Sequence, residues 1–239
     1  MVDVAHTVPS SPDCPPPSRG RRALPWLAGL LALALVVGGG LLIWKPWRSQ
    51  DLPQSACWSA LSKDDLKPLA GSHGKATEQG AARIQTPGVP DDPANRSNTC
   101  FLDWFPDGGD GSRTFLSVQV DPALDGIDAD RANASAGGRP VATLDFGTGA
   151  VGLATTETDR HVRLYVRCDF KVLRGGAAPQ YFRIDVGGNV LDGVPPAKAR
   201  QAQADIALKV ARVAAKEYEC ANQVRLPAIA PTIPDLANG

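Results

Sequence analysis

Histidine is the first residue type to consider for catalysis, because its imidazole is the side chain that titrates nearest physiological pH. The chain has three: His6 near the N-terminus, His73 in a polar stretch and His161 at the start of an alternating apolar run. Paired with a carboxylate, His73 or His161 would suit a cell-envelope hydrolase. No Gly-x-Ser-x-Gly sequence accompanies them. We therefore predict exposed polar histidines and no catalytic residue, with the hydrolase as the alternative.

The cysteines and the clustered aspartates give little support for a metal site. No two cysteines have the Cys-x-x-Cys spacing that is typical of zinc sites. Asp103, Asp107 and Asp110 lie among glycines, but they lack the ligand spacing of an EF-hand loop and are typical of a hairpin turn. The Gly-Thr-Gly sequence at 147–149 is not followed by a predicted helix, which a phosphate-binding loop requires. We predict neither a metal nor a cofactor.

Three arginines form the one candidate binding surface. Arg163, Arg167 and Arg183 alternate with apolar residues on two predicted strands, so they would form an exposed basic row that could contact an anionic envelope polymer. Asp169 and Asp185 lie close to them in sequence, and a solvated sheet face is the simpler interpretation. The whole chain has 25 basic and 25 acidic residues, a balance that argues against nucleic-acid binding.

A long uncharged stretch precedes these candidates. Residues 23–44 contain no charged side chain, and tryptophans lie near both ends at Trp26 and Trp44. A helix needs about 20 apolar residues to cross a bilayer, so this length suits one transmembrane helix in the lipid bilayer. A cleaved signal peptide has a shorter apolar core and a small-x-small cleavage site, whereas this stretch continues beyond its glycines at 38–40.

The orientation of this helix follows from its flanking charges. Arg19, Arg21 and Arg22 precede it, while only Lys45 and Arg48 follow closely. Positive charge favours the cytoplasmic side. We therefore expect a single-pass protein of the cell membrane, with a cytoplasmic N-terminus and an extracellular C-terminal domain.

The five cysteines agree with this orientation. Cys14 precedes the uncharged stretch, and four cysteines follow it: Cys57, Cys100, Cys168 and Cys220. Four cysteines outside the cell can form two disulfides, while a lone cytoplasmic cysteine stays reduced. Three pairings are possible, and we favour the one that joins Cys57 to Cys100 and Cys168 to Cys220, because each bridge would tie a helix to a strand through a shorter loop. The other two pairings remain open at this point.

Five segments follow from these patterns. They are a disordered cytoplasmic tail at 1–22, a transmembrane helix at 23–44, a linker at 45–56, an extracytoplasmic domain at 57–225 and a Pro-rich tail at 226–239. The Pro-rich ends cannot form a core.

Within the domain, strands alternate with turns before one long helix. Strands are predicted at 100–105, 114–120, 141–146, 150–155, 161–170 and 181–186, and helices after Ser62, at 127–135 and at 196–220. The polar stretch 71–98 is either a surface loop or contains a short strand at 81–85. Strands joined by short turns and followed by a helix indicate an α+β domain, in which the long helix covers a largely antiparallel sheet.

The layout also resembles a known group of proteins. Cys57 opens a short Asp-Asp-Leu helix capped by Ser62, Cys100 and Trp104 share a Cys-x-x-x-Trp strand, and an Ala-rich helix ends at Cys220. This resembles small membrane-anchored envelope proteins of unknown function from high-GC actinobacteria. The resemblance implies an α+β envelope domain and brings no activity or functional residue with it. This chain departs from the lipid-anchored members by its uncharged helix.

Together these features predict a membrane-tethered extracytoplasmic domain that binds a protein or a cell-envelope component. The sequence identifies neither the partner nor an activity.

Overall fold

The computed structural model describes residues 50–85, 98–109, 111–123, 126–156, 162–170 and 181–236, together with Leu30 and Val36. The chain divides into two units, Met1–Trp47 and Arg48–Gly239. The predicted cytoplasmic tail and almost all of the predicted transmembrane helix lie outside the described residues. Among the residues that are described, no helix has the length and apolarity needed to cross a membrane.

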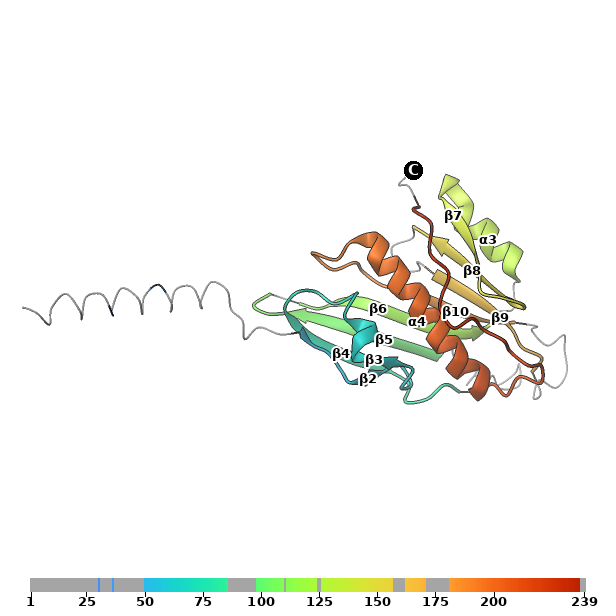
Figure 1. Ribbon diagram of the computed structural model, residues 1–239, viewed down its shortest axis with the longest axis horizontal. Coiled ribbons are helices and arrows are strands. Elements are labelled where there is room, and N and C mark those ends of the chain that lie inside the picture. Colours follow the sequence, from blue (N-terminus) through green and yellow to red (C-terminus); the bar gives the residue numbers. More distant parts are fainter. Residues whose placement is uncertain are drawn as a thin grey trace, which may run out of the picture. The chain divides into compact units, whose positions relative to one another are not determined.

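An eight-stranded sheet forms the centre of the second unit (Figure 1). Its strands lie in the order β1-β4-β5-β6-β10-β9-β8-β7, and every pair is antiparallel except β1 with β4. The bounds are β1 Gln50–Asp51, β4 Gly74–Gly80, β5 Asn98–Pro106, β6 Arg113–Pro122, β7 Val141–Asp145, β8 Ala150–Thr155, β9 Val162–Arg167 and β10 Tyr181–Gly187. This confirms the α+β prediction.

A small hairpin and three helices complete the described fold. They are β2 Ser55–Ala56 with β3 Leu61–Ser62, α2 Lys63–Leu66, α3 Ile127–Ser135 and α4 Pro196–Glu217, with a 3-10 turn at Ala136–Gly138. Helix α2 begins as predicted, because the Ser62 N–H donates to the Asp65 carboxylate at 2.8 Å. Asp65 also accepts a hydrogen bond from Lys209 at 2.5 Å, which ties α2 to α4.

Helix α4 crosses one face of the sheet against β9 and β10 (Figure 1). Its first residue, Pro196, lacks the backbone N–H that would be unsatisfied there in any case. Ala199, Ala202, Ile206 and Val210 are buried in the core, as the helical spacing predicts. Small residues in this stripe let the helix axis approach the sheet closely.

The opposite face of the same strands is buried by α3. Leu164 belongs to the main core, whereas its neighbour Tyr165 belongs to a second, smaller cluster with Ala123 and Leu153. Neighbouring residues on a strand point to opposite faces, so this second cluster lies on the face away from α4. The hydroxyl of Tyr165 donates to Asp130 of α3, which fixes the helix there.

One strand differs from the prediction. The polar stretch 71–98 contains a seven-residue strand, β4 at Gly74–Gly80, and the short strand proposed at 81–85 is absent. Only Gly74 and Ala76 are buried in β4, because the strand lies near the edge of the sheet. Without apolar alternation, the sequence carries no strand signal at this position.

The folded domain is also longer than predicted at both ends. Residues 50–56 were expected to be linker, but β1 joins the sheet and Leu52 is buried. Residues 226–236 were expected to be part of a free tail, but Ala230 and Leu236 are buried. The side chain of Gln201 on α4 accepts the Ile233 N–H at 3.0 Å, so the segment lies along α4 in an extended form.

Candidate functional site

Both predicted disulfides are present in the structure. Cys57 pairs with Cys100 and Cys168 pairs with Cys220, with Cα atoms 5.5 and 5.0 Å apart. Glu78 lies beside the first pair, and its ligand atoms with those two sulfurs fall within 4.8 Å of one another. Metals bind cysteine as thiolate, and sulfurs joined in a disulfide offer none, so the arrangement is not a metal site in this state.

The first disulfide holds an unusual turn. Cys57, Trp58 and Ser59 all have positive φ angles, of 46°, 61° and 60°. The Ala60 N–H donates to the Cys57 carbonyl at 3.0 Å, so Trp58 and Ser59 occupy the centre of a mirror-image turn. Glycine and asparagine usually fill these positions, and each ordinary residue there costs about 1–2 kcal/mol. The turn therefore stores strain that its surroundings must offset.

Glu78 on β4 supplies part of that support. Its carboxylate accepts the backbone N–H of Cys57 at 2.8 Å, while the Cys57–Cys100 disulfide joins the turn to β5. The side chain of Glu78 is nevertheless exposed. A carboxylate accepts several hydrogen bonds, so Glu78 retains capacity for a ligand.

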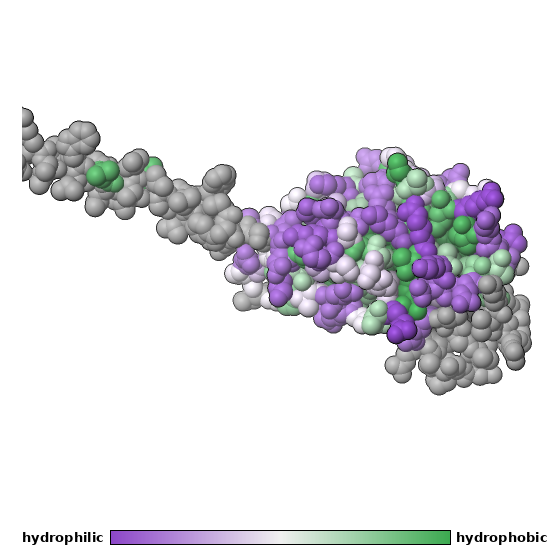
Figure 2. All heavy atoms as spheres, turned by 60° about the horizontal axis from the view of Figure 1, so that its bottom comes forward, coloured by the Kyte–Doolittle hydropathy of each residue, from purple (hydrophilic) through white to green (hydrophobic). Residues whose placement is uncertain are grey.

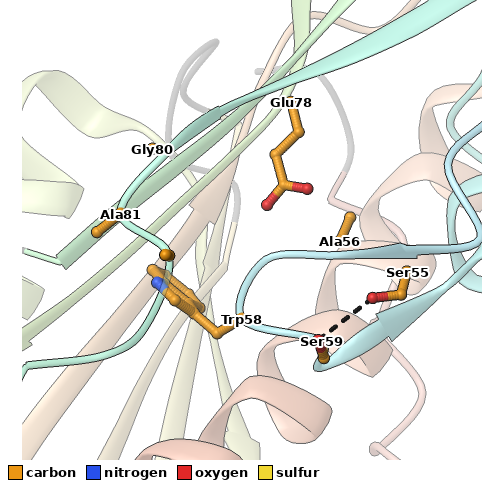
Figure 3. A pocket seen from close by; sticks show the side chains of 8 residues that line it. Ser55, Ala56, Trp58, Ser59, Glu78, Gly80 and Ala81 are labelled. Carbon is orange, nitrogen blue, oxygen red and sulfur yellow. Dashed lines mark hydrogen bonds between the residues drawn. The ribbon is translucent and has the colours of Figure 1, made fainter.

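A hollow of about 350 Å³ lies between this turn and the end of β4 (Figure 3). We call it the Trp58 hollow. Figure 3 shows the Trp58 ring on one side and the Glu78 carboxylate projecting from β4. The lining residues are Ser55, Ala56, Trp58, Ser59, Glu78, Gly80, Ala81 and Ala82. Its size is at the lower end of the range for ligand sites, and it combines an aromatic wall with one carboxylate.

The indole of Trp58 adds a polar group. Its Nε1 atom is buried and has no hydrogen-bond partner among the residues that the structure describes. A buried donor left without an acceptor costs about 1–3 kcal/mol. A strained turn and an accessible carboxylate thus line the Trp58 hollow, and the same turn carries a buried donor without a described partner.

A second hollow, of about 390 Å³, lies at the other end of β4. His73 lines it together with Ser72, Ser112 and Asp192, so a histidine, two hydroxyls and a carboxylate share one depression. The Asp192 side chain is almost fully exposed, and its carboxylate lies 3.9 Å from Arg113. His161, the other predicted catalytic histidine, lies outside the described residues.

The predicted basic row is not an exposed surface. Arg163 is only 6% exposed, and its Nε donates to Asp185 at 3.0 Å. Arg183 lies 2.8 Å from Asp185 and donates to Asp130 at 3.0 Å. Only Arg167 is exposed, 3.6 Å from the Asp169 carboxylate. The prediction failed for Arg163 and Arg183 because α3 covers the face on which they lie.

These buried charges form a structural network under α3. Burial would raise the pKa of Asp130, but hydrogen bonds from Tyr165 and Arg183 outweigh it and hold that pKa below its ordinary value. Burial, together with the Asp130 carboxylate, raises the pKa of Tyr165. Tyr165 thus stays protonated and donates, while Asp130 stays charged and accepts. These donors and acceptors are paired with one another, so the network is a poor candidate for a ligand site.

The surface offers small apolar patches. Phe101 and Phe105 on β5 are 38% and 43% exposed, and Ile229 is 78% exposed. On the face shown in Figure 2, hydrophobic residues lie in small groups between hydrophilic ones. The Trp58 hollow combines a strained turn, an aromatic ring and a carboxylate, so it is a stronger candidate binding site than these patches.

Comparison with protein-family models, curated proteins and solved structures finds no match to this chain. The envelope-protein resemblance accordingly remains an expectation from the sequence alone.

Neither Trp58 nor Glu78 is among the functional candidates that the sequence predicts. The predicted Cys57–Cys100 pair was a usable signal, because it places Trp58 beside the strand that carries Trp104. Glu78 carried no signal, since β4 itself was not predicted.

Proposed function

We propose that this chain is a membrane-tethered extracytoplasmic domain that binds a protein or a cell-envelope component in the Trp58 hollow, without catalysing a reaction. The observation that carries the proposal is the strained turn at residues 57–59 beside the accessible Glu78 carboxylate. Strained backbone persists where the surroundings impose it, and such residues cluster at ligand sites.

The proposed location rests on separate observations. Residues 23–44 have the length and apolarity of one membrane span, and more arginines precede them than follow closely. Two disulfides in the domain favour an oxidising compartment such as the outside of the cell. Cys14 would then lie in the cytoplasm. Labelling of Cys14 by a membrane-impermeant thiol reagent in intact cells would contradict this orientation.

Photocrosslinking in intact cells tests the binding role. A photoreactive amino acid at Ala82, an exposed position that lines the Trp58 hollow, should capture a discrete partner. The same amino acid at Thr143, exposed on β7, is the matched control and should capture much less. Equal capture from both positions would show that the hollow is not the binding site.

The second hollow supports one alternative, an envelope hydrolase that uses His73. The observation in its favour is the shared lining of His73, Ser72, Ser112 and Asp192. A fluorophosphonate probe labels an activated serine, so labelling that disappears in Ser72→Ala or Ser112→Ala would establish this role. Absence of labelling in the folded full-length protein would remove the serine-hydrolase version.

A further inference from the structure

We infer that the ligand of the Trp58 hollow is an extended peptide, which pairs with the free edge of β4 and places a lysine or arginine side chain against Glu78. This inference rests on the proposed binding function and names the chemistry of the partner. Three features carry it: the direction of the β4 backbone groups, the charge of Glu78 and the position of the Trp58 ring.

The backbone of β4 alternates between its neighbours. The Asp107 N–H donates to the His73 carbonyl, and the Ala81 N–H donates to the Thr99 carbonyl, both at 3.4 Å. Along an antiparallel pair, residues that bond to the partner strand alternate with residues whose backbone groups point away. Positions 73 and 81 both bond to β5, so the even positions between them, including Glu78 and Gly80, direct their N–H and C=O groups toward the opposite edge.

That opposite edge is only partly covered. Strand β1 pairs with Gly74 and Lys75 and goes no further. In the described part of the chain, no strand pairs with Glu78 or Gly80 along this edge. Unpaired N–H and C=O groups on a sheet edge are a template for an added strand. Both residues line the Trp58 hollow, so the free edge and the hollow coincide.

The register then decides which side chain enters the hollow. Residues opposite each other on paired strands have their side chains on the same face of the sheet. A ligand residue opposite Glu78 would therefore project beside the Glu78 carboxylate and toward the turn that carries Trp58. Among the described residues that line the hollow, Glu78 alone is charged. Charge complementarity thus selects a basic side chain at this position and disfavours an acidic one.

Trp58 favours the same type of side chain. A lysine or arginine near an indole ring gains a cation–π attraction, worth about 0.5–1 kcal/mol at an exposed site and more when it is desolvated. The long aliphatic part of such a side chain also covers apolar surface while its charge stays near water. In strand addition, backbone hydrogen bonds supply affinity and side-chain pockets supply specificity. The Trp58 hollow has both components.

The experiment uses the full-length protein in nanodiscs of zwitterionic lipid, which do not attract a basic peptide by charge. The probe is a short acetylated peptide of alternating valine and threonine with one central lysine. Its titration is followed by NMR of the Glu78 and Gly80 amides and the Trp58 indole N–H. Saturable shifts at all three support the inference. No binding, or shifts confined to other residues, overturns it.

Two altered peptides separate the components of binding. Replacing the lysine by glutamine should weaken binding on the order of tenfold, because the ion pair and the cation–π contact are both lost. Methylating the backbone nitrogens that face β4 should abolish strand addition. Undiminished binding of the methylated peptide would overturn the strand-addition mode, and undiminished binding of the glutamine peptide would overturn the basic-side-chain assignment.

Matched protein variants complete the test. Glu78→Gln should weaken the lysine peptide on the order of tenfold and leave the glutamine peptide unchanged. Asp192→Asn removes the same charge from the second hollow and should leave both peptides unaffected. Should photocrosslinking at Ala82 capture a partner while these peptides fail to bind, the proposed function would stand and the peptide assignment would fall.

Discussion

Strands β8–β10 are largely buried on both faces, whereas β4–β6 have a less covered outer face, which is half-buried on β6 and exposed at several positions of β4 and β5. In the first region, which we call the closed half, α4 and α3 cover opposite faces and the charged side chains pair with one another. In the second, the open half, Phe101 and Phe105 are exposed on the outer face and the Trp58 hollow lies at the end of β4.

The two halves also differ in their turns. The closed half places Gly147 and Gly149 at positive φ angles of 94° and 83°, where glycine has no steric cost. The open half places Trp58 and Ser59 at comparable angles. Among the described residues, the closed half has one non-glycine residue at positive φ, Glu219 at 47°, whereas the open half has three in succession at 57–59, next to an accessible carboxylate. This contrast supports the proposal that binding occurs in the open half while the closed half maintains the structure.

Removing the disulfides gives the largest expected effect. The two bridges close loops of similar length, with sequence separations of 43 and 52, so each should contribute about 4 kcal/mol by loop closure. Paired cysteine-to-serine variants should therefore lose similar free energies of unfolding in urea denaturation. Only the Cys57/Cys100 variant should lose crosslinking from Ala82, since that bridge holds the Trp58 turn. Equal loss of crosslinking in both variants would abolish the distinction.

Asp130→Ala tests the closed half alone. It leaves Arg183 and the Tyr165 hydroxyl without their shared acceptor, so unfolding should become easier by about 3 kcal/mol. Asp128→Ala on the same helix removes an exposed partner of Arg131 and should cost less than about 0.5 kcal/mol. Crosslinking from Ala82 should survive both changes. Similar costs for the two variants would show that the network contributes little.

Substitutions in the turns should change the stability of the protein in opposite directions in the two halves. Ser59→Gly relieves a left-handed residue and should stabilise the protein by about 0.5 kcal/mol. Gly149→Ala introduces a side chain at φ 83° and should destabilise it by about 1 kcal/mol. Thermal unfolding of both variants decides this. A destabilising Ser59→Gly would mean that the 57–59 turn is not strained.

Lowering the pH should give the smallest change in the free energy of unfolding, with contributions from Asp65 and Asp130. Burial would raise the pKa of Asp65, but a hydrogen bond from Lys209 helps to hold it below the ordinary value of 3.8. Burial would also raise the pKa of Asp130, but hydrogen bonds from Tyr165 and Arg183 hold it below the same value. Groups with lowered pKa values stabilise the fold above about pH 4 and lose that contribution as the pH falls through the folded pKa. Urea denaturation at pH 7 and pH 3 should show this loss, and Asp65→Asn and Asp130→Asn should each reduce it. An unchanged pH dependence would exclude both contributions.

The sequence predicted the elements whose signals are local. The spacing of Ile206 and Val210 identified the buried face of α4, and the Ser62–Asp65 capping box located α2. Both disulfide pairings were predicted from the layout of helices and strands. Each of these depends on short-range pattern or on a few long-range constraints.

The missed features depend on tertiary packing. Strand β4 is polar because it lies near a sheet edge, so no alternation marks it. Arg163 alternates with apolar residues as an exposed residue would, yet α3 buries it, and α3 is separated from β9 by two strands in sequence. The strain at Trp58 is a property of backbone angles, which neither composition nor spacing encodes.

We propose the Trp58 hollow as the binding site, and this claim can be tested directly. The most direct measurement is the yield of partner crosslinked from Ala82 in Trp58→Ala, with Phe105→Ala as the control that removes another exposed aromatic ring. Urea denaturation checks that both variants remain folded. We predict that the yield falls at least about tenfold in Trp58→Ala and is unchanged in Phe105→Ala. An undiminished yield in folded Trp58→Ala would contradict the claim.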